Sequence, residues 1–264
     1  MEDAVVPEPA QADTPPERPS VRPHRRRFVF IYGLLAAVFV FGLVGTVLWA
    51  GRAINPPPAW SAWKPSGGGL GAAKQIASHV AGTYHLQSGK QLVDVIAKSP
   101  SVAAGNQQIP IQFIALTGKK GVIDADFPVD PSNSLVYSLC GLGASCSIAT
   151  GTPSVARGTL VQREILELAL YTFKYVGGID HVVAFMPPKP GSPPTAAIYL
   201  QKGDLSQQLK LPLARTLSPK VPLASTIAIG EQKTILATTN ARIYQFSLSQ
   251  AQTGDAILVL KPAA

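Results

Sequence analysis

The sequence predicts an α+β extracytoplasmic domain, with a mixed sheet, one long packed helix and a C-terminal antiparallel meander, tethered by a single N-terminal transmembrane helix. Three observations support this fold class. Residues 28–50 form an uncharged apolar run, β-branched and aromatic runs accompany helical patterns after residue 70, and proline or glycine clusters separate the segments. With 46% hydrophobic and 14% charged residues among 264, the composition excludes a disordered chain, and two cysteines exclude a disulfide-dense scaffold.

The apolar run, FVFIYGLLAAVFVFGLVGTVLWA, is long enough to cross a membrane. As a helix rising about 1.5 Å per residue it would be roughly 34 Å long, against a hydrocarbon core of about 30 Å. A cleavable signal peptide is the main alternative, because small residues occur at 50–53. Since the run exceeds the roughly 7–15 apolar residues of a signal peptide, we expect an uncleaved signal-anchor.

The charges on either side of the run predict its orientation. Four arginines lie between residues 22 and 27, whereas only Arg52 follows closely. Because positively charged flanks stay in the cytoplasm, we expect a single-pass protein of the cell membrane with a cytoplasmic N-terminus and an extracytoplasmic C-terminal domain. Tryptophan and long basic side chains suit the membrane–water interfaces. The predicted interface residues are Arg25, Arg26, Arg27, Trp49, Trp60, Trp63 and Lys64.

Composition divides the rest of the chain into four segments. Residues 1–27 carry five acidic and five basic side chains and few large apolar ones, which predicts a disordered cytoplasmic tail. Residues 51–69 are rich in proline, glycine and tryptophan, which is typical of a linker. We expect an α+β region over 70–218. A β-meander over 219–264 should pack on it, because so short a piece rarely forms a core alone.

Periodicity and turn residues predict the elements of the folded region. Helices are expected over 70–80, 89–98 and 160–175, with a short one starting at Asp204. Strands are expected over 109–116, 121–127, 134–139, 179–186, 195–200, 233–238, 242–248 and 256–260.

The helix over 160–175 has well-marked ends. Thr159 and Gln162 form a capping-box pattern before it, and Gly177 with Gly178 stops it. Its broad apolar face should therefore lie against a sheet.

A polar stripe runs along the other side of this helix. It consists of Arg163, Glu167 and Lys174, and the first two are one turn apart. We expect a solvated ion pair there, with no catalytic role for Glu164 or Glu167.

Cys140 and Cys146 frame the segment CGLGASC. Outside the cytoplasm an isolated pair favours a disulfide, which here would close a small glycine-bearing loop. A labile redox pair and a metal site are the alternatives, and the metal site would need further ligands. The spacing matches neither thioredoxin-like nor c-type haem motifs.

The sequence offers no convergent catalytic pattern. Residues 143–147 lack the final glycine of a nucleophile elbow. Asp180 precedes His181, but adjacent residues of a strand point to opposite faces, so this aspartate would not orient the histidine. His79 and His85 are six residues apart and do not share a helical face. We therefore predict no catalytic, cofactor-binding or metal-binding residues.

The cysteine loop followed by REILELALYTFKYV, at 163–176, resembles uncharacterised single-pass envelope proteins of actinobacteria. This resemblance covers Leu139 to Pro187 and implies no activity. Residues 164–185 are also similar to the helix-then-strand end of GerMN-type modules of sporulation proteins, which implies a noncatalytic extracytoplasmic domain.

These features predict a membrane-anchored binding or assembly module of the bacterial cell envelope. The net charge of +8 belongs to residues 51–264, because the charges of the tail cancel. Besides the lipid bilayer, the expected partners are an anionic wall polymer, lipid headgroups or an envelope protein, met through Lys119, Lys120 or Lys189. The charge could instead serve solubility alone, and exterior placement argues against nucleic acid.

The alternative function is an envelope hydrolase or a thiol-redox protein. It would use His181 and Asp180, or the Cys140–Cys146 pair.

Overall fold

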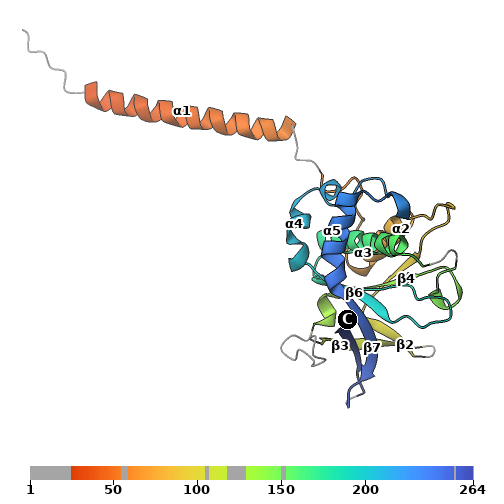
Figure 1. Ribbon diagram of the computed structural model, residues 1–264. Coiled ribbons are helices and arrows are strands. Elements are labelled where there is room, and N and C mark those ends of the chain that lie inside the picture. The colour runs from red at the N-terminus through yellow and green to blue at the C-terminus, as the bar shows by residue number, and fades with distance from the viewer. Residues whose placement is uncertain are drawn as a thin grey trace, which may run out of the picture. The chain divides into compact units, whose positions relative to one another are not determined.

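The computed structural model describes residues 25–54, 59–104, 107–117, 129–149, 153–252 and 254–263. The chain divides into two compact units, Met1–Pro57 and Pro58–Ala264 (Figure 1). The expected tail before Arg25 and the expected strand over 121–127 lie outside the described residues.

The first unit contains helix α1, Arg25–Ile54. Its stretch Phe28–Val47 has a mean hydropathy of 2.5, and its side chains are exposed within the described part of this unit. The hydroxyl of Thr46 donates to the carbonyl oxygens of Gly42 and Leu43, so this polar group is satisfied within the helix. The predicted span is thus a single helix whose length and composition suit a membrane anchor.

The second unit is an α+β fold. Its helices are α2 (Gly69–Ala81), α3 (Val155–Tyr175), α4 (Ser206–Lys210) and α5 (Ile229–Thr239). Its strands are β1 (Asp94–Lys98), β2 (Ser101–Ala104), β3 (Gln107–Leu116), β4 (Ser134–Cys140), β5 (His181–Phe185), β6 (Ala196–Gln201), β7 (Ile243–Gln250) and β8 (Ala256–Pro262).

The strands form one mixed sheet. Seven of them run in the order β1-β4-β5-β6-β7-β8-β3, and β2 adds an eighth beside β3. The pairs β4–β5 and β3–β8 are parallel, and the other pairs are antiparallel. Helices α2, α3, α4 and α5 of this unit gather on one side of the sheet in Figure 1.

Both faces of the central strands are buried, because successive side chains alternate between two cores. On β5, Val182 and Ala184 face the core under the helices, whereas Val183 joins a second core. The second core also contains Leu258 and Leu260 of β8, so the sheet curls until its far strands cover its own second face. This arrangement explains why the central strands are apolar at consecutive positions.

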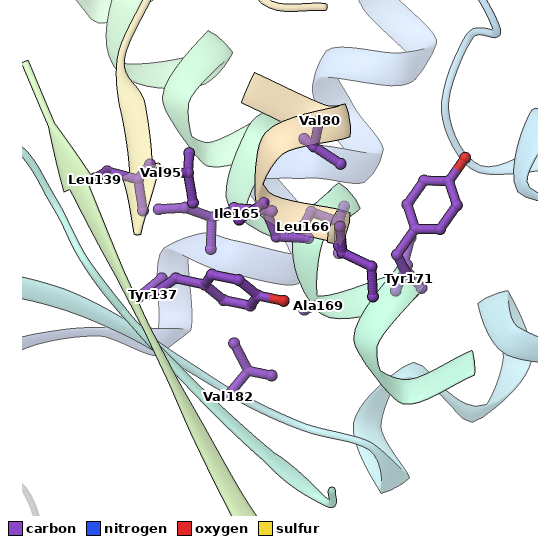
Figure 2. Close-up of a cluster of buried hydrophobic side chains, with 14 of the residues drawn as sticks. Val80, Val95, Tyr137, Leu139, Ile165, Leu166, Ala169, Tyr171 and Val182 are labelled. Carbon is purple, nitrogen blue, oxygen red and sulfur yellow. The ribbon is translucent and has the colours of Figure 1, made fainter. Parts of the chain in front are cut away.

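Helix α3 lies in the middle of the first core. Figure 2 shows Ile165 and Ala169 of α3 above Tyr137 of β4 and Val182 of β5. The phenol of Tyr137 and the hydroxyl of Thr172 are 2.7 Å apart, and Thr172 also donates to the carbonyl oxygen of Leu168. The expectation that a sheet covers the apolar face of this helix is confirmed.

Helix α3 begins earlier than the capping-box pattern at Thr159 predicts. The true cap is Ser154, whose hydroxyl accepts the Arg157 backbone N–H at 3.2 Å. Thr159 lies inside the first turns and donates to the carbonyl oxygen of Val155. A serine cap satisfies a backbone donor at the helix start as well as a threonine does, so the sequence offered two equivalent starts.

Two sequence-based elements are wrong. The expected helix over 89–98 is instead strand β1, in which buried Val95 alternates with exposed Ile96 and pairing with β4 supplies the backbone hydrogen bonds. The expected strand over 233–238 is instead helix α5. The C-terminal meander therefore shrinks to the β7–β8 hairpin.

Candidate functional site

Residues 59–66, the strap hereafter, pack on the domain although the sequence assigns them to a linker. The carbonyl oxygen of Trp60 accepts the backbone N–H of Leu213 at 2.7 Å. The hydroxyl of Ser61 lies 2.7 Å from the phenol of Tyr175, and Ser66 exchanges hydrogen bonds with Gln75. These contacts fix the strap against α2, the end of α3 and the segment after α4.

The two tryptophans of the strap form an aromatic cluster with the domain. Trp60 meets Tyr171 and Tyr175 edge-on, with ring centroids 5.5 and 5.6 Å apart. Trp63 stacks on His79 at 3.9 Å and meets Tyr171 edge-on. Sequence reasoning placed both indoles at a membrane interface by their distance from the span. The structure gives them partners in the domain, which nothing in the local sequence indicated.

A cleft of about 620 Å³ opens beside this cluster. Its walls are the strap, the end of α2, the middle of α3 and the segment 212–221. The residues that matter for its chemistry are Trp60, Ser61, Trp63, His79, Glu167, Tyr171 and Lys220. A mostly apolar cavity with a few polar groups is typical of small-molecule and polymer-segment sites.

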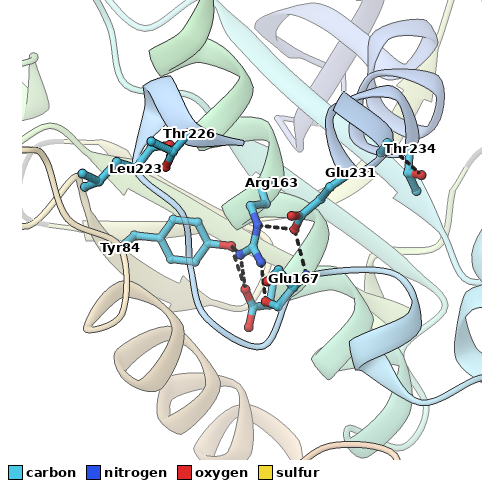
Figure 3. Close-up of polar contacts among 9 residues, drawn as sticks. Tyr84, Arg163, Glu167, Leu223, Thr226, Glu231 and Thr234 are labelled. Carbon is cyan, nitrogen blue, oxygen red and sulfur yellow. Dashed lines mark hydrogen bonds and ion pairs between the residues drawn. The ribbon is translucent and has the colours of Figure 1, made fainter. Parts of the chain in front are cut away.

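A buried ionic network borders the cleft through Glu167 and Ser218, and Figure 3 shows its polar contacts. The guanidinium of Arg163, whose side chain is 0% exposed, donates to Glu167 at 3.1 Å and to Glu231 at 2.8 Å. It also donates to the phenol of Tyr84 and, at 2.7 Å, to the carbonyl oxygen of Ser218. The i,i+4 ion pair expected from the sequence is present, but the expectation that it is solvated is wrong.

This network holds the cleft in shape. Glu231 accepts the backbone N–H of Ser218 as well as the Arg163 hydrogen bond, so the segment 212–221 is tied to α3 and α5. Tyr84 donates to Glu167 at 2.6 Å, which ties the chain after α2 to α3. A fully satisfied buried network fixes one arrangement of its elements.

Burial dominates the proton affinities around the cleft. It lowers the pKa of His79, partly opposed by Glu167, and thereby favours the neutral imidazole. Burial, reinforced by Glu167, raises the pKa of Tyr84, so the phenol stays protonated and can donate. Burial acts to lower the pKa of Arg163, but Tyr84, Glu167 and Glu231 raise it by more. The net shift is upward, so the guanidinium stays charged.

Two polar groups near the network are buried without a hydrogen-bond partner among the described residues. One is the carboxyl of Glu164, the other the indole N–H of Trp60. Burial first, and Glu167 second, raise the pKa of Glu164 well above its usual range, which favours the uncharged acid. Sequence reasoning expected no catalytic role for Glu164 and did not foresee that its side chain is fully buried.

The histidine of the alternative hypothesis lies elsewhere, at the start of β5. His181 Nδ1 is 2.8 Å from the Tyr199 phenol, and the two rings are stacked. Asp180 pairs with Lys202 at 3.6 Å. Asp180, His181 and Ser206 border one shallow pocket, yet no hydrogen bond joins Ser206 to His181 in the described part of the chain. Asp180 and His181 thus border one pocket, but no hydrogen bond between their side chains is present among the described residues.

Cys140 and Cys146 form a disulfide, as expected. The bridge closes a tight loop at the end of β4. A side chain at Gly141 would lie 2.5 Å from the Ser147 carbonyl oxygen, so glycine is required there. Of the predicted cationic contacts, Lys189 is exposed, whereas Lys119 and Lys120 lie outside the described residues.

No protein-family model, curated protein or solved structure matches this chain. The functional argument therefore rests on the geometry of the cleft and on the character of α1.

Proposed function

We propose that this chain is a membrane-anchored binding module of a bacterial cell envelope. In this proposal α1 spans the cell membrane, the N-terminus is cytoplasmic and the α+β domain is extracytoplasmic. The arginines before α1 and the apolar length of α1 support the orientation and the anchor. The Cys140–Cys146 disulfide supports an oxidising compartment.

The main support for a binding function is the cleft beside the strap. Trp60, Trp63 and Tyr171 supply broad ring surfaces, and Ser61 with His79 supplies neutral hydrogen-bonding groups. Beneath them, the Arg163 guanidinium pairs with the carboxylates of Glu167 and Glu231, so these three groups carry a net charge of −1. Such a site suits a ligand with an apolar face and several hydroxyl groups.

We propose that the ligand is a saccharide segment of an anionic wall polymer. Pyranose rings present the required apolar faces and hydroxyls, and Lys220 at the rim of the cleft would favour an anionic chain. The proposal includes kinship with single-pass envelope proteins of actinobacteria and with GerMN-type modules, supported by the resemblances at 139–187 and 164–185.

The anchor and its orientation are tested on the full chain in intact cells. A C-terminal tag should be removed by external protease, and the protein should remain with membranes after alkaline extraction. Mature protein that begins after residue 50, or a tag that external protease cannot reach, would contradict the proposal.

Binding is tested by tryptophan fluorescence of the full chain in neutral-lipid nanodiscs, titrated with soluble glycan fragments of purified cell wall. Ala62 is exposed at the cleft, so Ala62→Arg should block it and weaken binding at least about tenfold. Ala237→Arg, on the exposed side of α5, is the matched control and should bind as the wild type does. Equal binding by both variants, or binding only to anionic vesicles, would overturn the saccharide assignment.

A further inference from the structure

Strand β1 forms one edge of the sheet. It pairs with β4 on one side, and the strand order places no described strand on its other side. An open edge of this kind exposes backbone N–H and C=O groups that a further strand can use.

The direction of the open backbone groups follows from a single hydrogen bond. The backbone N–H of Val95 is bonded to the side chain of Asp94 at 3.0 Å, so it points away from β4. Because the bonding direction alternates along a strand, the groups of Ala97 also point outward, and those of Ile96 point toward β4. The outer edge therefore offers two residues, spaced two apart, for pairing, and the Asp94 carboxylate releases the Val95 N–H when a further strand is added.

The side chains of β1 divide between the two faces of the sheet. Val95 and Ala97 are buried in the core under the helices. Asp94, Ile96 and Lys98 share the opposite face, and Ile96 is 48% exposed. Its neighbours at 94 and 98 carry opposite charges at the two ends of the strand.

Neither of these charges has an ionic partner in the described chain. The carboxylate of Asp94 accepts only the backbone N–H of Val95 among the hydrogen bonds found. Lys98 makes no ion pair with any described residue, and partial burial lowers its pKa. Each charge would gain from an opposite charge brought to the edge.

We propose that β1 pairs antiparallel with β1 of a second copy of this chain, about a two-fold axis at Ile96. In this register Val95 of each copy exchanges backbone hydrogen bonds with Ala97 of the other. Asp94 lies opposite the second copy's lysine at 98, and the two isoleucines at 96 meet at the axis. The register that fits the hydrogen-bonding direction is therefore also the one that pairs every charge.

The agreement between the hydrogen-bonding register and the charge pairing indicates that the added strand is β1 of a second copy of this chain. A symmetric interface places the same patch on both partners, so a strand can serve only if its sequence is self-complementary under reversal. The strand DVIAK meets this condition, with an acid at one end, a base at the other and an apolar residue in the middle. A groove of about 430 Å³ beside α2, bordered by Lys74, Ser78 and Ile96, leaves the edge accessible.

Disulfide trapping tests the register on the full chain in membranes. The described cysteines are both bonded to each other, so Ile96→Cys introduces a single reactive thiol. Directly opposed residues of a non-hydrogen-bonded pair have Cβ atoms about 5 Å apart, close enough for a disulfide with slight adjustment. Mild oxidation should convert most of the Ile96→Cys protein to a covalent dimer.

The matched control is Ile229→Cys, because Ile229 is still more exposed, at 86%, but lies on α5. This variant should remain mostly monomeric under the same oxidation. Equal rates of cross-linking for the two variants would indicate random collision and overturn the proposal.

Exchange of the charges at positions 94 and 98 distinguishes this interface from any association through α1. In the Ile96→Cys background, Lys98→Asp places like charges opposite each other twice and should reduce cross-linking about fivefold. The combined Asp94→Lys and Lys98→Asp exchange should restore it, which also shows that the altered strand folds. Failure of the exchange to restore cross-linking, or no loss with Lys98→Asp, would overturn the proposal, whatever the outcome for glycan binding.

Discussion

The side chain of Arg163 donates from Nε to the carboxylate of Glu231, 2.8 Å away and 68 residues later in the chain. The arginine is completely buried, and the glutamate is only 10% exposed. This pair joins α3 to α5 and, through the backbone of Ser218, holds one wall of the cleft.

Removal of the Glu231 carboxylate should therefore be costly. Glu231→Ala leaves a buried guanidinium short of one partner, and we expect a loss of about 3 kcal/mol in the free energy of unfolding. The measurement is denaturant unfolding of the full chain in detergent, followed by near-ultraviolet circular dichroism. Asp180→Ala is the control, because its ion pair with Lys202 is about half exposed and should contribute less than about 1 kcal/mol. Similar losses in both variants would show that burial adds nothing to the Arg163 pair.

The buried carboxyl of Glu164 should make stability fall as pH rises. Its pKa is raised in the folded chain by burial and by Glu167, so the folded state retains a proton that the unfolded state releases above about its ordinary value of 4.5. Stability is thus greatest below that value and declines up to the folded-state pKa. Because glutamine does not titrate, Glu164→Gln should become progressively more stable than the wild type as pH rises.

Thermal melts of both proteins between pH 4 and pH 8 measure this difference. Asp180→Asn serves as the control, since it makes the same kind of substitution at an exposed carboxylate. A constant difference between Glu164→Gln and the wild type over the whole range would contradict a buried, protonated acid.

Loss of the disulfide should destabilise the domain moderately. The bridge closes a short loop, and the chain-entropy model gives about 2 kcal/mol for a loop of this size. The double variant Cys140→Ser with Cys146→Ser should show this loss in denaturant unfolding. A reducing agent should lower the stability of the wild type by the same amount and leave the variant unaffected. A reducing agent without effect on the wild type would contradict a structural role for the bond.

Local signals explain why some elements were predicted well. The span over 28–50 follows from composition alone, and α3 follows from strong periodicity and from glycines at its end. The strands β4, β5 and β6 carry β-branched residues between clear turns. In each case the local preference and the tertiary environment agree.

The elements that were missed are those in which the local preference and the tertiary environment disagree. The segment 89–98 carries apolar residues at helical spacing, Leu92, Val95 and Ile96, but pairing of β1 with β4 selects the extended form. Helix α5 carries the β-branched run KTILAT, yet Ile235 of this helix packs in the core and Glu231 of the same helix binds Arg163. Long-range partners of this kind leave no trace in a window of ten residues.

The candidate site was foreseen only in fragments. The i,i+4 spacing of Arg163 and Glu167 predicts their ion pair, but not its burial, because the covering groups come from Tyr84, Ser218 and Glu231. The tryptophans of the strap were noticed for their nearness to the span. Their packing against Tyr171 depends on how the chain returns over α3.

The sequence by itself determined the apolar helix, the main packed helix and the disulfide, because each depends on composition or on residues close together in the chain. Tertiary structure alone decided the strand at β1, the helix at α5, the cleft and the burial of Arg163 and Glu164. A side chain's exposure and partners depend on segments tens of residues away, and only the folded chain brings those segments into contact.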